Sequence, residues 1–151
     1  MIRPLLPGDV ARLAAALARL PLLVRYRRDA GRIGEDLRAA LDRGDGLLVE
    51  DRDGSARGLA WFLRGGTLGV GGYLRLLAVV PEATGEGIGA VLLAAFEAEV
   101  AKESRHAFLL VSDFNEGARR FYERHGYAPV GEVPGLVLPD VGERIYWKRL
   151  R

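Results

Sequence analysis

The stretch that most restricts the fold of this chain is LLAVVPEATGEGIGAVLLAAFEAEV, residues 76–100. An apolar run of strand character stops at Pro81, three alternating glycines follow at Gly85, Gly87 and Gly89, and a helical pattern begins. Glycines at the start of a helix let the backbone approach an anion closely and present unpaired N–H groups to it. The stretch therefore predicts a strand, a phosphate-binding turn and a helix over about 87–102. A plain turn would need fewer glycines, because each one weakens a helix.

The patterns on either side predict a mixed sheet. The expected order is β-α-α-β-β-β-α-β-α-β-β, an α/β (α+β) fold with a mostly antiparallel sheet of six or seven strands and about four helices. No linker or repeat interrupts it, so residues 1–151 are expected to form a single domain. In the first half, Asp9 is the expected N-cap of a helix over 10–20, residues 21–46 are expected as a loop and a second short helix ending near Gly44, and a hairpin over 47–63 turns at Asp53-Gly54. A mobile glycine-rich connector is expected over 64–72. The second half predicts strands at 73–80 and 106–113, a helix over 115–125 ended by Gly126, and strands at 127–135 and 142–150.

Composition excludes several classes of function. The chain has no cysteine and only two histidines, His106 and His125, so no metal site is expected, and neither histidine needs a catalytic role. The net charge is +2 with acidic and basic residues interspersed, which argues against nucleic-acid binding. No apolar run approaches a membrane span and no signal-peptide pattern begins the chain, so no membrane contact and a cytoplasmic location are expected.

Three phosphate motifs compete for the glycines. The Walker A pattern is absent. The dinucleotide fingerprint fits loosely as Gly85, Gly87 and Ala90, with Asp113 near the position of a ribose-binding carboxylate. Four residues separate the strand from the first glycine, and too few strand–helix units follow. A nucleotide-dependent oxidoreductase is therefore a disfavoured alternative.

The third motif is carried by two segments. AVVPEATGEGIGA, residues 78–90, and SDFNEGARRFYERHGYAPVG, residues 112–131, resemble the signature segments of the GNAT superfamily of acetyl-CoA-dependent N-acetyltransferases. The resemblance extends over essentially the whole chain, including IRP near its start and ERIYWKRL near its end. It implies a GNAT-like fold, acetyl-CoA as co-substrate, and acetyl transfer to a primary amine by direct attack in a ternary complex.

The resemblance also implies a set of site residues. The strand at Leu77, Ala78 and Val79 would bind the pantetheine arm, and the N–H of Val79 would stabilise an oxyanion. Asn115 would contact that arm or an ordered water while also capping its helix. Tyr122 would donate a proton to the leaving sulfur, whereas Phe121 is expected in the core. The backbone amides of seven consecutive residues would hold the pyrophosphate: Thr84, Gly85, Glu86, Gly87, Ile88, Gly89 and Ala90.

Two departures from the family pattern leave alternatives open. Thr84 stands where the family has Gln or Arg, so it contributes no charge to the pyrophosphate and is an alternative cap for the helix. The strand before the turn carries no carboxylate, so the base is unassigned among Glu50, Asp113 and a chain of waters. A non-catalytic CoA-binding sensor or regulatory domain is therefore the alternative function.

The acceptor is not identified by any motif. A small-molecule amine and a peptide amine both remain open, as does a homodimer. Two tryptophans, Trp61 and Trp147, are expected in the core. Four arginines could face an acidic substrate, although a solvated charged surface is the favoured interpretation: Arg25, Arg27, Arg28 and Arg75.

Overall fold

Seven strands form one sheet in a computed structural model that describes residues 1–151. They are β1 (Ile2–Pro4), β2 (Gly46–Arg52), β3 (Ser55–Thr67), β4 (Gly71–Val79), β5 (His106–Ser112), β6 (Ala128–Pro134) and β7 (Gly142–Arg149). The order across the sheet is β1-β2-β3-β4-β5-β7-β6, and β4 and β5 form its one parallel pair. The predicted mixed, mostly antiparallel sheet is confirmed.

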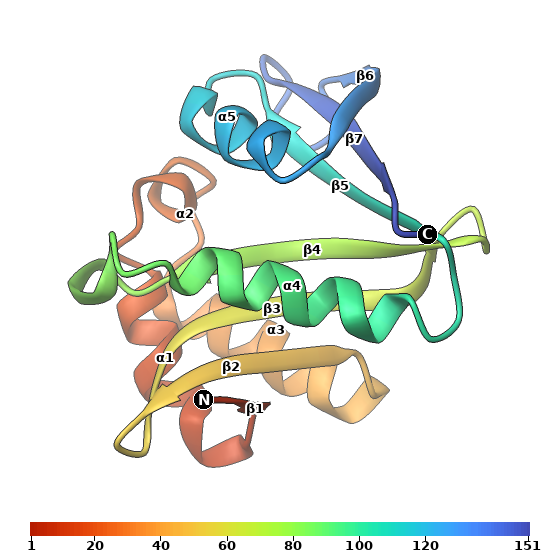
Figure 1. The fold of residues 1–151 in the computed structure, drawn as a ribbon. Coiled ribbons are helices and arrows are strands. Elements are labelled where there is room, and N and C mark those ends of the chain that lie inside the picture. Colours follow the sequence, from red (N-terminus) through yellow and green to blue (C-terminus); the bar gives the residue numbers. More distant parts are fainter.

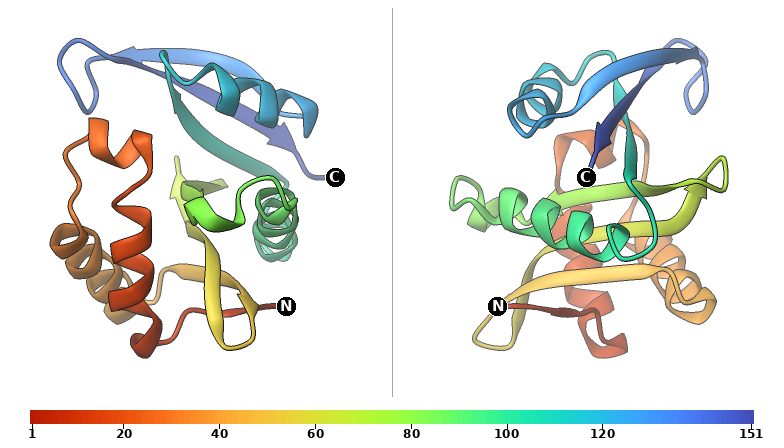
Figure 2. Two further views of the ribbon diagram at one scale, coloured as in Figure 1. Left: turned by 90° about the vertical axis from the view of Figure 1, so that its left-hand side faces the viewer. Right: turned by 45° about the vertical axis from the view of Figure 1, so that its right-hand side comes forward.

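Helices cover both faces of the sheet (Figures 1 and 2). The first three lie on one side, and α4 and α5 lie on the other. The chain also makes two short 3₁₀ turns, η1 before α1 and η2 before α4. The elements are η1 (Pro7–Asp9), α1 (Val10–Leu17), α2 (Pro21–Arg25), α3 (Ala30–Arg43), η2 (Pro81–Ala83), α4 (Ile88–Val100) and α5 (Glu116–Arg124).

Three local expectations were wrong. The segment expected as a loop contains α2, whose start is set by Pro21 at the first helical position. Asp9 occupies the N-cap position of α1, but its carboxylate accepts from the Leu6 amide and pairs with Arg3 instead of capping the helix. The connector over 64–72 is ordered, because β3 and β4 extend through it to a turn at residues 68–70. Backbone pairing across a hairpin stabilises strands that composition alone does not predict.

The core lies between the sheet and its helices, in a cluster of 30 buried residues. Phe96 of α4 is fully buried and makes an edge-to-face contact with Phe62 of β3, with 5.2 Å between ring centroids. This contact fixes α4, and with it the glycine turn, against the middle of the sheet.

Replacing that ring tests how the turn is supported. Phe96→Ala is expected to lower the free energy of unfolding by about 3–5 kcal/mol, because it leaves a cavity in a closed core. Denaturant unfolding measures the loss. The control is Val91→Ala on the exposed face of the same helix, which should change stability by about 0.5 kcal/mol or less. Equal losses in the two variants would contradict this placement of the core.

Candidate functional site

The glycine turn forms an open cradle at the start of α4. Gly85 and Gly87 adopt left-handed backbone conformations, with φ of 86° and 79°. A Cβ on either would meet nothing within 4 Å, and residues 84–87 are all exposed. Only glycine adopts these angles without strain, and the space that side chains would fill is left free.

The N-terminus of α4 supplies unpaired backbone donors. Gly87 is the N-cap, no side chain caps the helix, and the first helical bond runs from the Val91 amide to the Gly87 carbonyl at 3.3 Å. The amides of Ile88, Gly89 and Ala90 therefore have no helical acceptor. Thr84 is extended and ends η2, so the alternative in which it caps the helix is wrong. The cradle suits an anion such as a phosphate.

A wedge-shaped gap opens between β4 and β5 (Figure 1). The two strands pair only over Gly72–Leu74 and Ala107–Leu109, and then diverge. The Val80 amide donates to Arg57 of β3, and because successive amides alternate in direction, the amides of Leu77 and Val79 face the gap. Ala78 instead directs its carbonyl towards β3.

Helix α5, on the same side of the sheet as α4, carries a buried tyrosine. Asn115 caps α5 by accepting from the Ala118 amide at 3.1 Å, which confirms its capping role. Tyr122 is 9% exposed, and its ring packs edge-to-face on Phe121 and Tyr127. Burial raises the pKa of Tyr122 well above the ordinary tyrosine value. Its hydroxyl makes no hydrogen bond within the protein.

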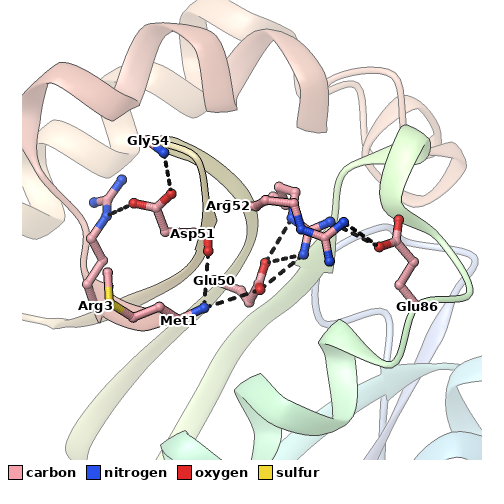
Figure 3. Close-up of polar contacts among 8 residues, drawn as sticks. Met1, Arg3, Glu50, Asp51, Arg52, Gly54 and Glu86 are labelled. Atoms are coloured by element: carbon pink, nitrogen blue, oxygen red, sulfur yellow. Dashed lines mark hydrogen bonds and ion pairs between the residues drawn. The ribbon is translucent and has the colours of Figure 1, made fainter.

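The cradle contains one carboxylate, that of Glu86, which ion pairs with Arg52 and Arg57 hold away from the turn (Figure 3). Arg57 lies 2.9 Å from Glu50 and 3.0 Å from Glu86, and Arg52 lies 3.5 Å from Glu86. Arg57 holds the pKa of Glu50 below its usual value, and the amino group of Met1 also contacts that carboxylate. Glu50 is thus engaged by Arg57 and by the Met1 amino group, which disfavours it among the candidates left open for the base.

The other candidate groups are also accounted for structurally. Asp113 accepts from the Gly142 amide at 2.9 Å, which ties the end of β5 to β7. Arg75 stacks on Trp61, with 4.4 Å from its guanidinium carbon to the ring centroid. Arg28 pairs with Asp36. Trp61 is buried as expected, whereas Trp147 is half-buried and donates to His106.

The comparisons with known proteins agree with this geometry. A model of the acetyltransferase (GNAT) family matches residues 16–127. The chain belongs to this family. No curated protein matches the sequence. The nucleotide-dependent oxidoreductase alternative is overturned by the family match and by the mostly antiparallel sheet.

Solved GNAT structures share the whole fold at low sequence identity. A protein described as a GNAT acetyltransferase from Desulfovibrio desulfuricans is 21% identical, with a TM-score of 0.83 and coverage of 100% of this chain and 99% of that one. An aminoglycoside 6'-N-acetyltransferase complexed with coenzyme A is 18% identical, with a TM-score of 0.81 and coverage of 100% and 97%. A ribosomal-protein-alanine N-acetyltransferase from Brucella melitensis is 19% identical, with a TM-score of 0.76 and coverage of 99% of each chain. These likenesses show the fold alone.

One side-chain cluster of this GNAT chain was missed from the sequence. Glu143 of β7 is 5% exposed and accepts hydrogen bonds from Tyr26, at 2.6 Å, and from Ser112, at 3.0 and 3.2 Å. Tyr26 and Ser112 also contact each other. The three residues lie far apart in the sequence, so no spacing or motif could have joined them.

Two cavities are lined in part by residues of the first two helices. The first, of about 560 Å³, lies between α1, the β2–β3 turn and η2. Its three arginines all have partners: Arg12 binds Ser55, Arg19 binds Glu82, and Arg57 binds Glu50. The other, of about 400 Å³, lies between the end of α2 and residues 138–141, and Arg25 and Arg27 line it without ion-pair partners. No group of three His, Asp or Glu side chains forms a metal site, and no helix is long and apolar enough to cross a bilayer.

Proposed function

We propose that this GNAT protein transfers an acetyl group from acetyl-CoA to a primary amine. The observation that carries the proposal is the uncapped N-terminus of α4 beneath an open glycine turn. Backbone amides in this arrangement bind the pyrophosphate, and most of the binding therefore does not depend on the side chain of Thr84. The unpaired edge of β4 at Leu77 and Val79 would bind the pantetheine arm, and the amide of Val79 would stabilise the oxyanion.

Tyr122 supplies the proton that the leaving thiolate needs. Its raised pKa keeps the hydroxyl protonated at neutral pH, and no protein acceptor competes for that proton. Asn115 keeps α5 in position through its cap, and it contacts the pantetheine arm or a water. The co-substrate requires no metal for this chemistry.

The first test is acetyl-CoA-dependent thiol release across a panel of primary amines. The panel should include an alkyl diamine, amino acids, an aminoglycoside and a peptide with a free N-terminus, each with no-amine and no-protein controls. Release that depends on one amine class is expected. Saturable acetyl-CoA binding without release for any amine would favour a CoA-binding sensor, and absence of binding would contradict the proposed function altogether.

The charge of Glu86 gives a second prediction. Glu86→Gln is expected to tighten acetyl-CoA binding about two- to fivefold at low ionic strength, because it removes a negative charge beside the phosphates and frees Arg57 and Arg52. Titration calorimetry at two salt concentrations measures the change. Glu35→Gln on the exposed surface of α3 makes the same change in net charge and should leave the affinity unaltered. Equal affinities for Glu86→Gln and the original protein at low salt would show that the phosphates bind elsewhere.

A further inference from the structure

Glu143 is a buried carboxylate without a cationic partner. Its neighbours within hydrogen-bond distance are two neutral hydroxyls, and no Lys, Arg or terminal amine pairs with it. Hydrogen bonds from hydroxyls satisfy the carboxylate oxygens of Glu143, but they supply no positive charge to this 5% exposed group. A buried carboxylate in this state favours binding of a cation that the protein itself does not provide.

The cluster lies on the side of the sheet opposite the cradle. Ser112 and Glu143 are directly paired across β5 and β7, so their side chains share one face. The neighbouring pair, Val111 and Arg144, faces the other way. Tyr146, which shares that other face, donates to Glu123 of α5. Glu143 therefore faces the first three helices, whereas α4 and α5 lie behind it (Figure 2).

The cluster also sits at the open end of the gap. Ser112 is the last residue of β5, beyond the point at which that strand leaves β4. Tyr26 reaches it from the segment after α2, and Arg25 stacks on Phe114 at 3.8 Å from the ring centroid. The cavity of about 400 Å³ is lined by Arg25, which precedes Tyr26 in the chain, and by Val141, two residues before Glu143. An acceptor entering from this side would meet a thioester that reaches the gap from the side of α4.

We propose that Glu143 binds the ammonium group of the acceptor and takes its proton, an inference that rests on the acetyltransferase function proposed above. The ammonium R–NH₃⁺ gives one proton to the carboxylate and becomes R–NH₂. Its lone pair forms the C–N bond, and the C–S bond breaks. Tyr122 gives its proton to the leaving CoA sulfur, and the second nitrogen proton, released as the amide forms, restores the Tyr122 hydroxyl. The proton on Glu143 passes to solvent.

Tyr26 and Ser112 act as positioning residues. Burial and the bond to Glu143 raise the pKa of Tyr26 to about 12, so its hydroxyl remains a donor at neutral pH. The two hydroxyls hold the carboxylate in one orientation and occupy only part of its accepting capacity. Because both hydroxyls are neutral, the negative charge of Glu143 remains available to the ammonium group of the acceptor.

The test compares Glu143→Gln with the original protein. For the amine that the original protein uses best, kcat/KM at pH 7 is expected to fall at least about 100-fold, with KM for the amine raised and kcat lowered. The Kd for acetyl-CoA should stay within about twofold. Between pH 7 and 9 the variant should regain kcat/KM about tenfold per pH unit, because deprotonation in solution replaces the lost base. Arg25, Tyr26 and Tyr73 are the other ionisable groups near the cluster, and the raised pKa values of the two tyrosines keep their hydroxyls protonated in this range.

Matched variants separate the outcomes. Glu132→Gln, a substitution at an exposed position of β6, should leave kcat/KM for the amine and Kd for acetyl-CoA unchanged. Turnover of Glu143→Gln equal to that of the original protein, or a loss that no rise in pH restores, would overturn the role of Glu143 while leaving the acetyltransferase function standing. An original protein that binds acetyl-CoA but acetylates no amine would overturn the acceptor site, and one that fails to bind acetyl-CoA would overturn the proposed function.

Discussion

Tyr122→Phe is expected to lower kcat about 100-fold or more while leaving acetyl-CoA affinity and protein stability nearly unchanged. The substitution removes the proposed general acid but keeps the ring that packs on Phe121 and Tyr127. Because the hydroxyl has no partner in the protein, its loss should change the free energy of unfolding by about 0.5 kcal/mol or less. Steady-state kinetics, titration calorimetry and denaturant unfolding measure the three quantities.

Tyr127→Phe is the matched control for this prediction. The Tyr127 hydroxyl donates to Glu97 at 2.9 Å, so its removal should cost about 1–3 kcal/mol of stability and leave kcat unchanged. Tyr122→Phe is therefore expected to lose kcat but keep its stability, and Tyr127→Phe to lose stability but keep its kcat. Normal kcat in Tyr122→Phe would refute the general-acid role, and a large loss of stability in that variant would make its kinetics a structural effect.

The raised pKa of Tyr122 adds a pH dependence. An ordinary tyrosine loses its proton near pH 10, whereas burial keeps Tyr122 protonated beyond that point. The kcat of the original protein should therefore show no alkaline decline from this group below about pH 10. A decline of kcat that begins near pH 8 would show that a group other than Tyr122 is the general acid.

Gly87→Val is expected to raise the Kd for acetyl-CoA about 100-fold or more. At φ of 79° a β-branched residue is strained by about 1–3 kcal/mol, and relaxation of that strain moves the amides that form the cradle. The new side chain also occupies the open space where the ligand phosphates are proposed to lie. Calorimetric titration measures the affinity, and the thermal shift produced by acetyl-CoA provides a second measure.

Gly44→Val is its control, because Gly44 has a φ of 80° and equally open surroundings at the end of α3. Both variants should lose similar stability, but only Gly87→Val should lose binding. A similar loss of acetyl-CoA affinity in the two variants would mean that the effect arises from general destabilisation. Unchanged affinity in Gly87→Val would show that the cradle is not part of the binding site.

The local parts of the site were predictable from the sequence because they are contiguous. A helix start, its glycines and its unpaired amides depend on residues within one turn of each other, so residues 84–90 indicated an anion site directly. The cap at Asn115 and the order of strands and helices are local in the same sense, and the structure confirms them apart from the additional helix α2. Asp9 occupies the predicted N-cap position, but its carboxylate pairs with Arg3 instead of capping the helix. The alternative of Thr84 as a cap is wrong because Thr84 ends η2 and Gly87 takes the N-cap position.

Partnerships across the sheet were decided only by the tertiary structure. Glu50 reads as a free carboxylate in the sequence, but β3 places Arg57 against it. Glu143 reads as a surface charge near the end of the chain, yet β5 and α2 bury it against two hydroxyls. A carboxylate is a base, an ion-pair partner or a substrate ligand according to which groups surround it, and folding brings those groups from distant segments. The sequence by itself thus indicated the open glycine turn at which we propose that an anion binds, whereas the packing of the sheet determined that Glu143 is buried without a cationic partner.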